Sequence, residues 1–457
     1  MITHALSPVH TRLASFSSLR AATTTTLQMS AAPPRHIVVI GAGIQGTSVA
    51  YQLHKRSASF PPHSSITILE SQAVASAASG KGGGFMARSW GNGVTTGLHE
   101  LGFDMYEELC AELNVQSYRK LPVLSVAPGR PPSNKGNQQS VKERNPSLSD
   151  VIPDWLDGSV GRISPLGLGE DTAQVTPKEF VEKMMDRMMN ANCSDGGLSF
   201  KLVMGTCTGI DYEEGDGSKS ITGVRYTAND KEHTLEASDV IVSAGPWSCK
   251  AEHWFENSVQ LPMEGVKSTS IVWKPPLDHE GKLKSVDATA LFCGEDERFG
   301  THLEVYPRPD GTVYICGIGG SDYISTSDLQ SSAFLSSCPP KPDRVTAATS
   351  AFHAMSNTYA QKGELQTVQA CMRPCPPDAL PYMGTVPGYS GAYINAGHNC
   401  WGIAWAPACG RAMAELVLDG ECACLDLNPF DPARFTTSSK RGGRGRKKGS
   451  LSVGEQW

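Results

Sequence analysis

The fold is decided by the stretch HIVVIGAGIQG at residues 36–46. A short run of β-branched apolar residues is typical of a buried parallel strand, and the G-x-G-x-x-G pattern after it indicates a dinucleotide-binding turn that opens a helix. Gly41 permits the tight turn, Gly43 lets the backbone approach a pyrophosphate, and Gly46 lets helix and strand pack closely. The N-terminus of the helix would offer free N–H groups to the phosphates.

An acidic residue follows the next predicted strand. Residues 66–69 read ITIL and Glu70 comes directly after them. A carboxylate at this place accepts ribose hydroxyls and repels a 2′-phosphate, which disfavours NADP. The interval from Gly41 to Glu70 is longer than the usual spacing of about 20 residues, and the proline-containing loop at residues 57–65 accounts for the excess. A glycine-rich turn without a ligand is the alternative.

Three further segments favour FAD over NAD. They read SGKGGG at residues 79–84, VIVSAGPW at 240–247 and GHNCWG at 397–402. An NAD domain needs no second glycine-rich segment after the acidic residue. An extended FAD passes its ribityl chain and ring over backbone, so it does need one. The sequence therefore predicts FAD.

These segments resemble the FAD-dependent oxidoreductases of the D-amino-acid oxidase (DAO) superfamily, in particular the glycine oxidase and sarcosine oxidase branch. The resemblance runs from about residue 36 to 420. It rests on the glycine turn with Glu70, residues 240–248, the sequence RPCPPDALPYMG at 373–384, and residues 397–418. Four motifs in this order are specific for the superfamily and not for a substrate. The segments around 128–150 and 325–345 match no part of the family pattern.

The resemblance implies an α/β fold of two domains, with a Rossmann-type FAD-binding domain and an inserted, mostly antiparallel β-sheet substrate domain. We assign residues 35–118, 160–262 and 360–425 to the first domain, and 119–159 and 263–359 to the second. Residues 1–34 are expected to form a disordered or targeting extension, and 426–457 a disordered basic tail.

The compartment stays open between the cytoplasm and an organelle. Residues 1–69 hold no Asp or Glu, as in mitochondrial or plastid transit peptides. A disordered extension, or a second start at Met29, are the alternatives. The 13 cysteines form no C-x-x-C pair, which favours a reducing, intracellular compartment. No apolar run is long enough for a membrane span, and the net charge of −6 gives no basic field for nucleic acid.

The resemblance also implies a substrate site. In relatives, the arginine of the Arg-Pro motif holds the substrate carboxylate, and Arg373 occupies that place; a guanidinium offers a carboxylate a planar two-donor fork. A structural ion pair with Asp378 is the alternative. Arg88 aligns with a second substrate-facing arginine. Glu304 lies on an alternating strand at 301–307, on one face with a histidine and a tyrosine; a solvated edge would show the same pattern.

The expected FAD contacts include one cysteine of special interest. Cys371-Met372 matches the pair whose cysteine binds flavin covalently in the sarcosine branch, but Arg373 replaces that branch's aromatic residue, and a buried, inert thiol is the alternative. No His/Cys cluster has zinc spacing, and Cys422 and Cys424 are interpreted as small buried hydrophobes. The residues expected to contact FAD are Gly41, Gly43, Ile44, Gln45, Gly46, Glu70, Ser79, Gly80, Lys81, Cys207, Ala244, Gly245, Cys371, Gly397 and His398.

The function implied is oxidation of the C–N bond of an amino acid or secondary amine, with hydride transfer to flavin N5 and hydrolysis of the imine. The electron acceptor is O2 or another compound. The strand at 313–317 lacks the lysine that assists oxygen in sarcosine-type oxidases, which speaks against direct use of O2. A flavoprotein with an assembly role and little turnover is the alternative from another class, and an NAD-linked dehydrogenase is a third.

Overall fold

The computed structural model describes residues 32–129, 139–191, 197–282, 286–331 and 338–436. The expected N-terminal extension and the Lys/Arg-rich part of the tail lie outside these ranges. The described residues from Pro34 onward belong to one compact unit. Within the described ranges, no helix is long and apolar enough to cross a lipid bilayer.

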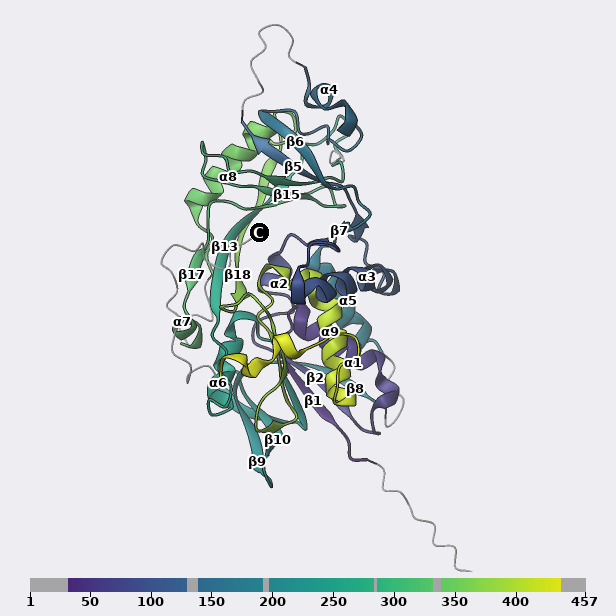
Figure 1. Ribbon diagram of the computed structural model, residues 1–457, viewed down its shortest axis with the longest axis vertical. Helices are drawn as coiled ribbons and strands as arrows, with labels where there is room; N and C mark the ends of the chain where they lie inside the picture. The colour runs from purple at the N-terminus through teal and green to yellow at the C-terminus, as the bar shows by residue number, and fades with distance from the viewer. Residues whose placement is uncertain (1–31, 130–138, 192–196, 283–285, 332–337, 437–457) are drawn as a thin grey trace, which may run out of the picture. The chain divides into compact units, whose positions relative to one another are not determined.

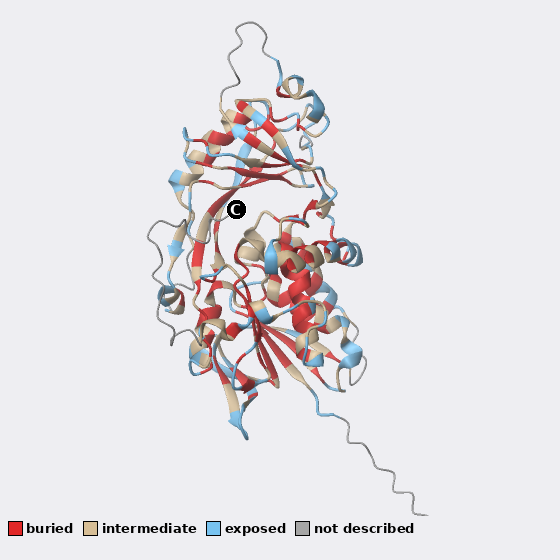
Figure 2. Cartoon of the chain, in the orientation of Figure 1, coloured by how far each residue is buried: buried red, intermediate tan, exposed pale blue. Residues whose placement is uncertain are grey.

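A six-stranded sheet carries the glycine turn. Its order is β19-β21-β12-β1-β2-β8, and all neighbours are parallel except β19. The central strands are apolar and β-branched, and they are buried along their length (Figure 2). The strands predicted around residues 36–40, 66–69 and 392–395 are confirmed. The bounds are β1 His36–Ile40, β2 Ser65–Glu70, β8 Ser199–Met204, β12 Asp239–Val242, β19 Tyr382–Thr385 and β21 Ala392–Ala396.

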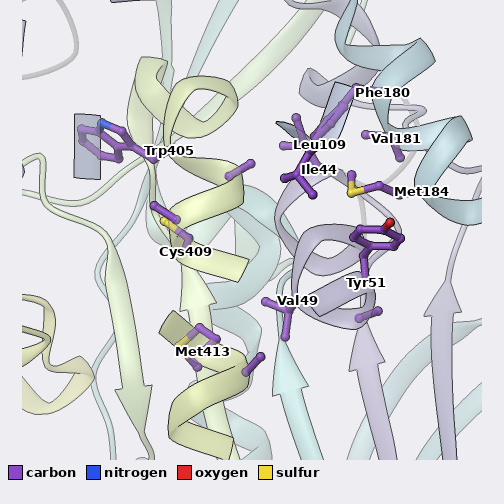
Figure 3. Packing of buried hydrophobic residues seen from close by; sticks show 14 of the residues in the cluster. Ile44, Val49, Tyr51, Leu109, Phe180, Val181, Met184, Trp405, Cys409 and Met413 are labelled. Carbon is purple, nitrogen blue, oxygen red and sulfur yellow. The ribbon is translucent and has the colours of Figure 1, made fainter. Parts of the chain in front are cut away.

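Four helices gather on one side of this sheet (Figure 1). They are α1 Ile44–Lys55, α3 Thr96–Glu112, α5 Pro177–Met189 and α9 Gly402–Asp419. Side chains of α1 lie between those of α5 and α9 (Figure 3). On α5, Met184, Met185 and Met188 are buried in the core, whereas Met189, at the end of the helix, is exposed. Burying such a side chain contributes about 1.5–3 kcal/mol, so this cluster holds the glycine turn in place.

An eight-stranded, mostly antiparallel sheet forms the second layer. Its order is β17-β13-β16-β15-β14-β5-β6, with β18 on β13. Helix α8, Pro342–Met355, packs on this sheet through Phe352, which contacts Trp273 at 5.7 Å between ring centroids. The bounds are β5 Val123–Pro128, β6 Val160–Gly167, β13 Glu264–Lys274, β14 Ala290–Cys293, β15 Glu304–Pro307, β16 Val313–Cys316, β17 Asp322–Ile324 and β18 Glu364–Cys375.

Smaller elements complete the fold. A four-stranded sheet holds β9 Thr206–Glu214, β10 Lys219–Ala228, β11 Lys231–Glu236 and β20 Tyr389–Ser390; a three-stranded sheet holds β3 Phe85–Ala87, β4 Arg119–Lys120 and β7 Thr172–Gln174. The short helices are α2 Ala78–Lys81, α4 Val141–Arg144, α6 Ala251–Trp254 and α7 Thr326–Gln330. The α/β class and the mostly antiparallel second sheet are confirmed.

Three boundaries differ from expectation. Strand β6 pairs with β5 in the eight-stranded sheet, although residues from 160 were assigned to the FAD-binding domain. Strand β18 pairs with β13 there too, although residues from 360 received the same assignment. The disordered tail expected from residue 426 is wrong for 426–435, because Phe430 is buried and Arg434 binds Asp378 through two hydrogen bonds of 2.8 and 3.1 Å.

Candidate functional site

A cavity of about 350 Å³ lies where the carboxyl ends of β1, β2 and β12 meet the inner face of the eight-stranded sheet. Ligands of open α/β sheets bind at the carboxyl ends of the strands, and this volume is in the range of small-molecule sites. The six-stranded sheet supplies the glycine turn, and β15, β16 and β18 supply the opposite wall. The cavity therefore has a backbone-rich end and a side-chain-rich end.

The glycines of the turn are fixed by close approach of backbone. Gly41 has a φ of +108°, and a Cβ there would lie 2.6 Å from the carbonyl oxygen of Ser243. A Cβ on Gly46 would lie 2.1 Å from the oxygen of Gly41. A Cβ on Gly43 would meet only the Ser79 hydroxyl, at 3.0 Å. The small size of Gly41 and Gly46 thus allows the tight turn, and the backbone of Gly43 faces the cavity.

Glu70 lies in the cavity beside this turn. Its Oε2 accepts from the N–H of Ala42 at 2.8 Å, and its Oε1 accepts from the N–H of Gln72 at 2.8 Å. The residue is 9% exposed. These two backbone donors hold the carboxylate in one orientation. This is the placement expected of the acidic residue that receives a ribose.

Several buried polar atoms on the cavity wall have no hydrogen-bond partner within the protein. They are Ser243 Oγ, Asn395 Oδ1, His398 Nε2 and Asn399 Oδ1. Buried polar groups are almost always hydrogen-bonded, so these atoms mark places for a polar ligand. Burial lowers the pKa of His398 to about 3, which keeps its ring neutral. Together with the glycine cradle, these groups fit the extended, polar FAD.

Helix α9 begins at the cavity and is tied to α1. The side-chain amide of Gln45 donates to the carbonyl of Gly402 at 2.6 Å, and Asn395 donates to Gln45 at 3.4 Å. The helix opens at Gly402. Its free N–H groups and positive dipole end therefore face the cavity, where they favour negative charge.

Most residues expected at the cofactor line the cavity, and three stand behind it. Gly46, Gly80 and Lys81 do not line it. A Cβ on Gly80 would lie 2.0 Å from the oxygen of Ala75, and Lys81 donates to the carbonyl of Ala370 at 3.2 Å. These residues support the wall. The lining members of the set are Gly41, Gly43, Ile44, Gln45, Glu70, Ser79, Cys207, Ala244, Gly245, Cys371, Gly397 and His398.

Arg88 lies away from the cavity. Its guanidinium binds Asp104 of α3 through two hydrogen bonds of 2.8 and 2.9 Å, with its side chain 41% exposed. This is a surface ion pair, against the expectation of a substrate-facing group. Arg88 is not among the residues that line the cavity, so it leaves the proposed site.

The polar face of β15 lines the cavity. Glu304 and Tyr306 are 7% and 4% exposed, and the Tyr306 hydroxyl donates to Glu304 Oε2. Leu303 and Val305 point into the core. The alternation read from the sequence is confirmed, and this burial excludes a solvated edge. Burial raises the pKa of Tyr306 well above its ordinary value, so its hydroxyl remains a donor. The thiol of Cys316 also donates to Glu304, at 3.4 Å.

Arg373 reaches the same region from β18, where it pairs with Val266 of β13. Burial raises the pKa of the Cys400 thiol to about 11, while the Arg373 guanidinium lowers it and the Glu304 carboxylate raises it. One thiol therefore lies within range of both charges. Asp378, the alternative partner for Arg373, binds Arg434 instead. Arg373 and Glu304 both line this cavity.

An aromatic wall that the sequence analysis missed closes this end. Phe85 lies 5.3 Å from Trp90, 5.2 Å from Phe292 and 5.7 Å from Tyr306, between ring centroids, and Tyr314 lies 6.1 Å from Tyr306. All five line the cavity. They come from four strands and a loop, so no local spacing marks them. The wall gives the side-chain-rich end an apolar surface.

Cys371 lines the cavity as a protonated thiol. Burial raises its pKa to about 11, although Arg373 acts in the opposite direction. Only about one thiol in 10,000 is then a thiolate at pH 7, and the thiolate is the nucleophile. We expect acid precipitation of the purified protein to release its FAD into the supernatant. If the wild-type pellet stayed yellow and the pellet of Cys371→Ser were colourless, this expectation would be contradicted and a covalent bond shown.

Comparison with known proteins agrees with this geometry. A family model described as FAD dependent oxidoreductase (DAO) matches residues 36–416. A Schizosaccharomyces pombe protein named as a putative oxidoreductase is 25% identical over 87% of this chain and 98% of its own length. The peroxisomal sarcosine oxidase of Mus musculus is 22% identical over 88% and 97%. The glycine oxidase structure from Geobacillus kaustophilus has a TM-score of 0.61 at 15% identity, covering 88% and 99%, and shows a shared fold.

Proposed function

This chain belongs to the DAO family of FAD-dependent oxidoreductases, and from that premise we propose that it oxidises the C–N bond of a carboxylate-bearing amino acid or secondary amine. FAD is the cofactor of this family, so the NAD-linked alternative falls away. The observation that carries the proposal is the placement of Arg373 and Glu304 in one buried cavity, next to the cofactor cradle.

The two charges suit the two ends of a zwitterion. The Arg373 guanidinium can bind the substrate carboxylate with two parallel donors. Glu304 can accept from the substrate ammonium. Among the lining residues of the described chain, the carboxylates are Glu304 and Glu70, and Glu70 lies at the glycine turn. Glu304 is thus the acid placed to recognise the amine.

The bound FAD supplies the two-electron acceptor for hydride leaving the carbon that bears nitrogen. The side chains of the protein position that carbon and accept one proton from the substrate. An ammonium must lose a proton before the nitrogen lone pair can form the imine, and the Glu304 carboxylate can take that proton. The Tyr306 hydroxyl and the Cys316 thiol both donate to Oε2 and fix the orientation of the carboxylate. The low exposure of Glu304 and Tyr306 keeps bulk water from the reacting atoms.

The aromatic wall supports a substrate with an apolar substituent. We expect Trp90→Ala to raise KM about tenfold for amines with a large apolar group, because that group loses part of its buried contact surface. Substrates the size of glycine or sarcosine should change less than twofold. The measurement is steady-state kinetics of this one variant with a large and a small substrate, and the small substrate serves as the control. Equal changes for both sizes would contradict the assignment of the wall to substrate binding.

An anaerobic flavin-reduction screen tests the proposal. The purified yellow protein is mixed without oxygen with a panel of L- and D-amino acids, N-methyl amino acids and amines lacking a carboxylate. We expect loss of the flavin absorbance near 450 nm (a general flavin property) with members that carry both amine and carboxylate. No loss with any member would overturn the proposal in favour of an assembly role.

A further inference from the structure

Three side chains with metal-ligand atoms meet at the C-terminal end of α9. They are Glu415, Cys422 and Cys424, and one ligand atom from each lies within 4.8 Å of the others. The Sγ atoms of Cys422 and Cys424 are 3.7 Å apart, and Cys422 Sγ lies 3.8 Å from Glu415 Oε2. Both cysteines are free thiols and only half-buried. This differs from the sequence interpretation of two buried hydrophobes.

The spacing of the ligand atoms matches tetrahedral coordination. Zinc binds thiolate sulfur at about 2.3 Å and carboxylate oxygen at about 2.0–2.2 Å. Two sulfurs at a tetrahedral angle around zinc are then about 3.8 Å apart, and a sulfur and an oxygen about 3.5–3.6 Å. The observed separations are 3.7 and 3.8 Å. The third pair, Cys424 Sγ and a carboxylate oxygen of Glu415, lies within 4.8 Å.

The ligand atoms are also held in place by their surroundings. Glu415 Oε2 accepts from the N–H groups of Ala423 and Cys424, each at 2.9 Å, and Oε1 accepts from Arg411 Nε at 2.9 Å. Gly420, at a φ of +81°, turns the chain so that the cysteines return onto α9. Hydrogen bonds that orient a ligand carboxylate are a usual support of metal sites.

We propose that Glu415, Cys422 and Cys424 form a binding site for a thiophilic divalent cation of the zinc class, with water in the fourth position. Two thiolates favour zinc over magnesium or calcium, and the carboxylate favours it over Cu(I). Each thiol gives its proton to the solvent when its sulfur binds the cation. Thirteen residues of α9 separate Glu415 from Gly402, about 20 Å along the helix, so the site is independent of the flavin.

Zinc binding to the FAD-loaded protein tests the proposal. The full chain, without a histidine tag, is reduced, stripped with a chelator and titrated with Zn²⁺ by calorimetry and by competition with a chromogenic chelator. Co²⁺ is added in parallel, since thiolate ligands give it strong near-ultraviolet charge-transfer absorption. We expect one equivalent at micromolar affinity or tighter, which Cys422→Ser/Cys424→Ser abolishes and Glu415→Gln weakens at least about tenfold. Cys338→Ser, another half-buried thiol, should bind like the wild type.

Each outcome decides the proposal. No zinc binding by the reduced protein, or binding that survives in the double serine variant, overturns it. A Cys422–Cys424 disulfide in freshly isolated protein, with no metal uptake after reduction, points to a thiol pair without a metal and also overturns it. Flavin content and anaerobic flavin reduction should be unchanged in all variants. Loss of zinc binding is therefore distinguishable from failure of the proposed oxidation.

Discussion

Replacing Arg373 by alanine is expected to slow anaerobic flavin reduction by the responding substrate about 100- to 1000-fold. The loss corresponds to about 3–4 kcal/mol, because truncating one partner of a buried, hydrogen-bonded charge pair costs about 2–5 kcal/mol. Part of that cost is the substrate carboxylate left without its donors. The measurement is stopped-flow absorbance over a range of substrate concentrations, with carboxylate inhibitor binding followed in the flavin spectrum.

Arg88→Ala is the matched control for this experiment. It removes an arginine that the sequence pattern also placed in the site, but which binds Asp104 at the surface. Its rate of reduction should stay within twofold of the wild type. Both variants should keep their FAD, since neither guanidinium is expected to hold it. If Arg373→Ala kept the wild-type affinity for carboxylates, or if Arg88→Ala were the slow variant, the carboxylate clamp would be misassigned.

Replacing Gly46 by alanine is expected to yield protein without FAD. The new Cβ would lie 2.1 Å from the carbonyl oxygen of Gly41 and 3.1 Å from Val39 Cγ1. Strand β1 and helix α1 must then separate, which displaces the turn that faces the pyrophosphate. Such overpacking costs about 1–3 kcal/mol or more. Flavin absorbance per polypeptide and the unfolding temperature, measured with and without added FAD, report the two consequences.

Gly294→Ala serves as the control for added volume. A Cβ there meets nothing closer than 3.6 Å, and the residue is exposed. This variant should carry wild-type flavin. If Gly46→Ala fails to fold, Glu70→Gln gives a second test. This variant keeps the shape of the side chain but removes the negative charge of the carboxylate, whose oxygens accept from the N–H groups of Ala42 and Gln72. A fully loaded, stable Gly46→Ala protein would show that close packing at this turn is not needed for FAD.

The cofactor end could be predicted from the sequence because its signals are local. Gly41, Gly43 and Gly46 lie in one short turn with a fixed spacing, and the alternation through Glu304 follows from strand geometry. The prediction that Arg88 faces the substrate was wrong because the order of the motifs indicates where a residue lies in the chain but not which residue its side chain binds. Asp104, which binds it, lies on the next helix.

The aromatic wall and the domain boundary could not be predicted because they depend on contacts between segments that are distant in the sequence. The aromatic wall joins Phe85 to Phe292, which lie more than 200 residues apart in the chain, so no spacing rule reveals it. The predicted domain boundary at residue 160 differs from the structure because the sequence of β6 does not show that this strand pairs with β5. The cluster of Glu415, Cys422 and Cys424 is local by contrast, because Glu415 lies only seven residues before Cys422; it forms because the turn at Gly420 brings both thiols back beside the Glu415 carboxylate.

One measurement addresses the central claim most directly. The FAD-loaded protein is mixed without oxygen with a slight excess of the substrate that bleaches its flavin, and the products are counted after one turnover. Oxidation of a C–N bond predicts one carbonyl product and one released amine or ammonia for each flavin reduced. Flavin reduction without a matching carbonyl product, or a flavin that no amine in the panel reduces, would contradict the proposed function.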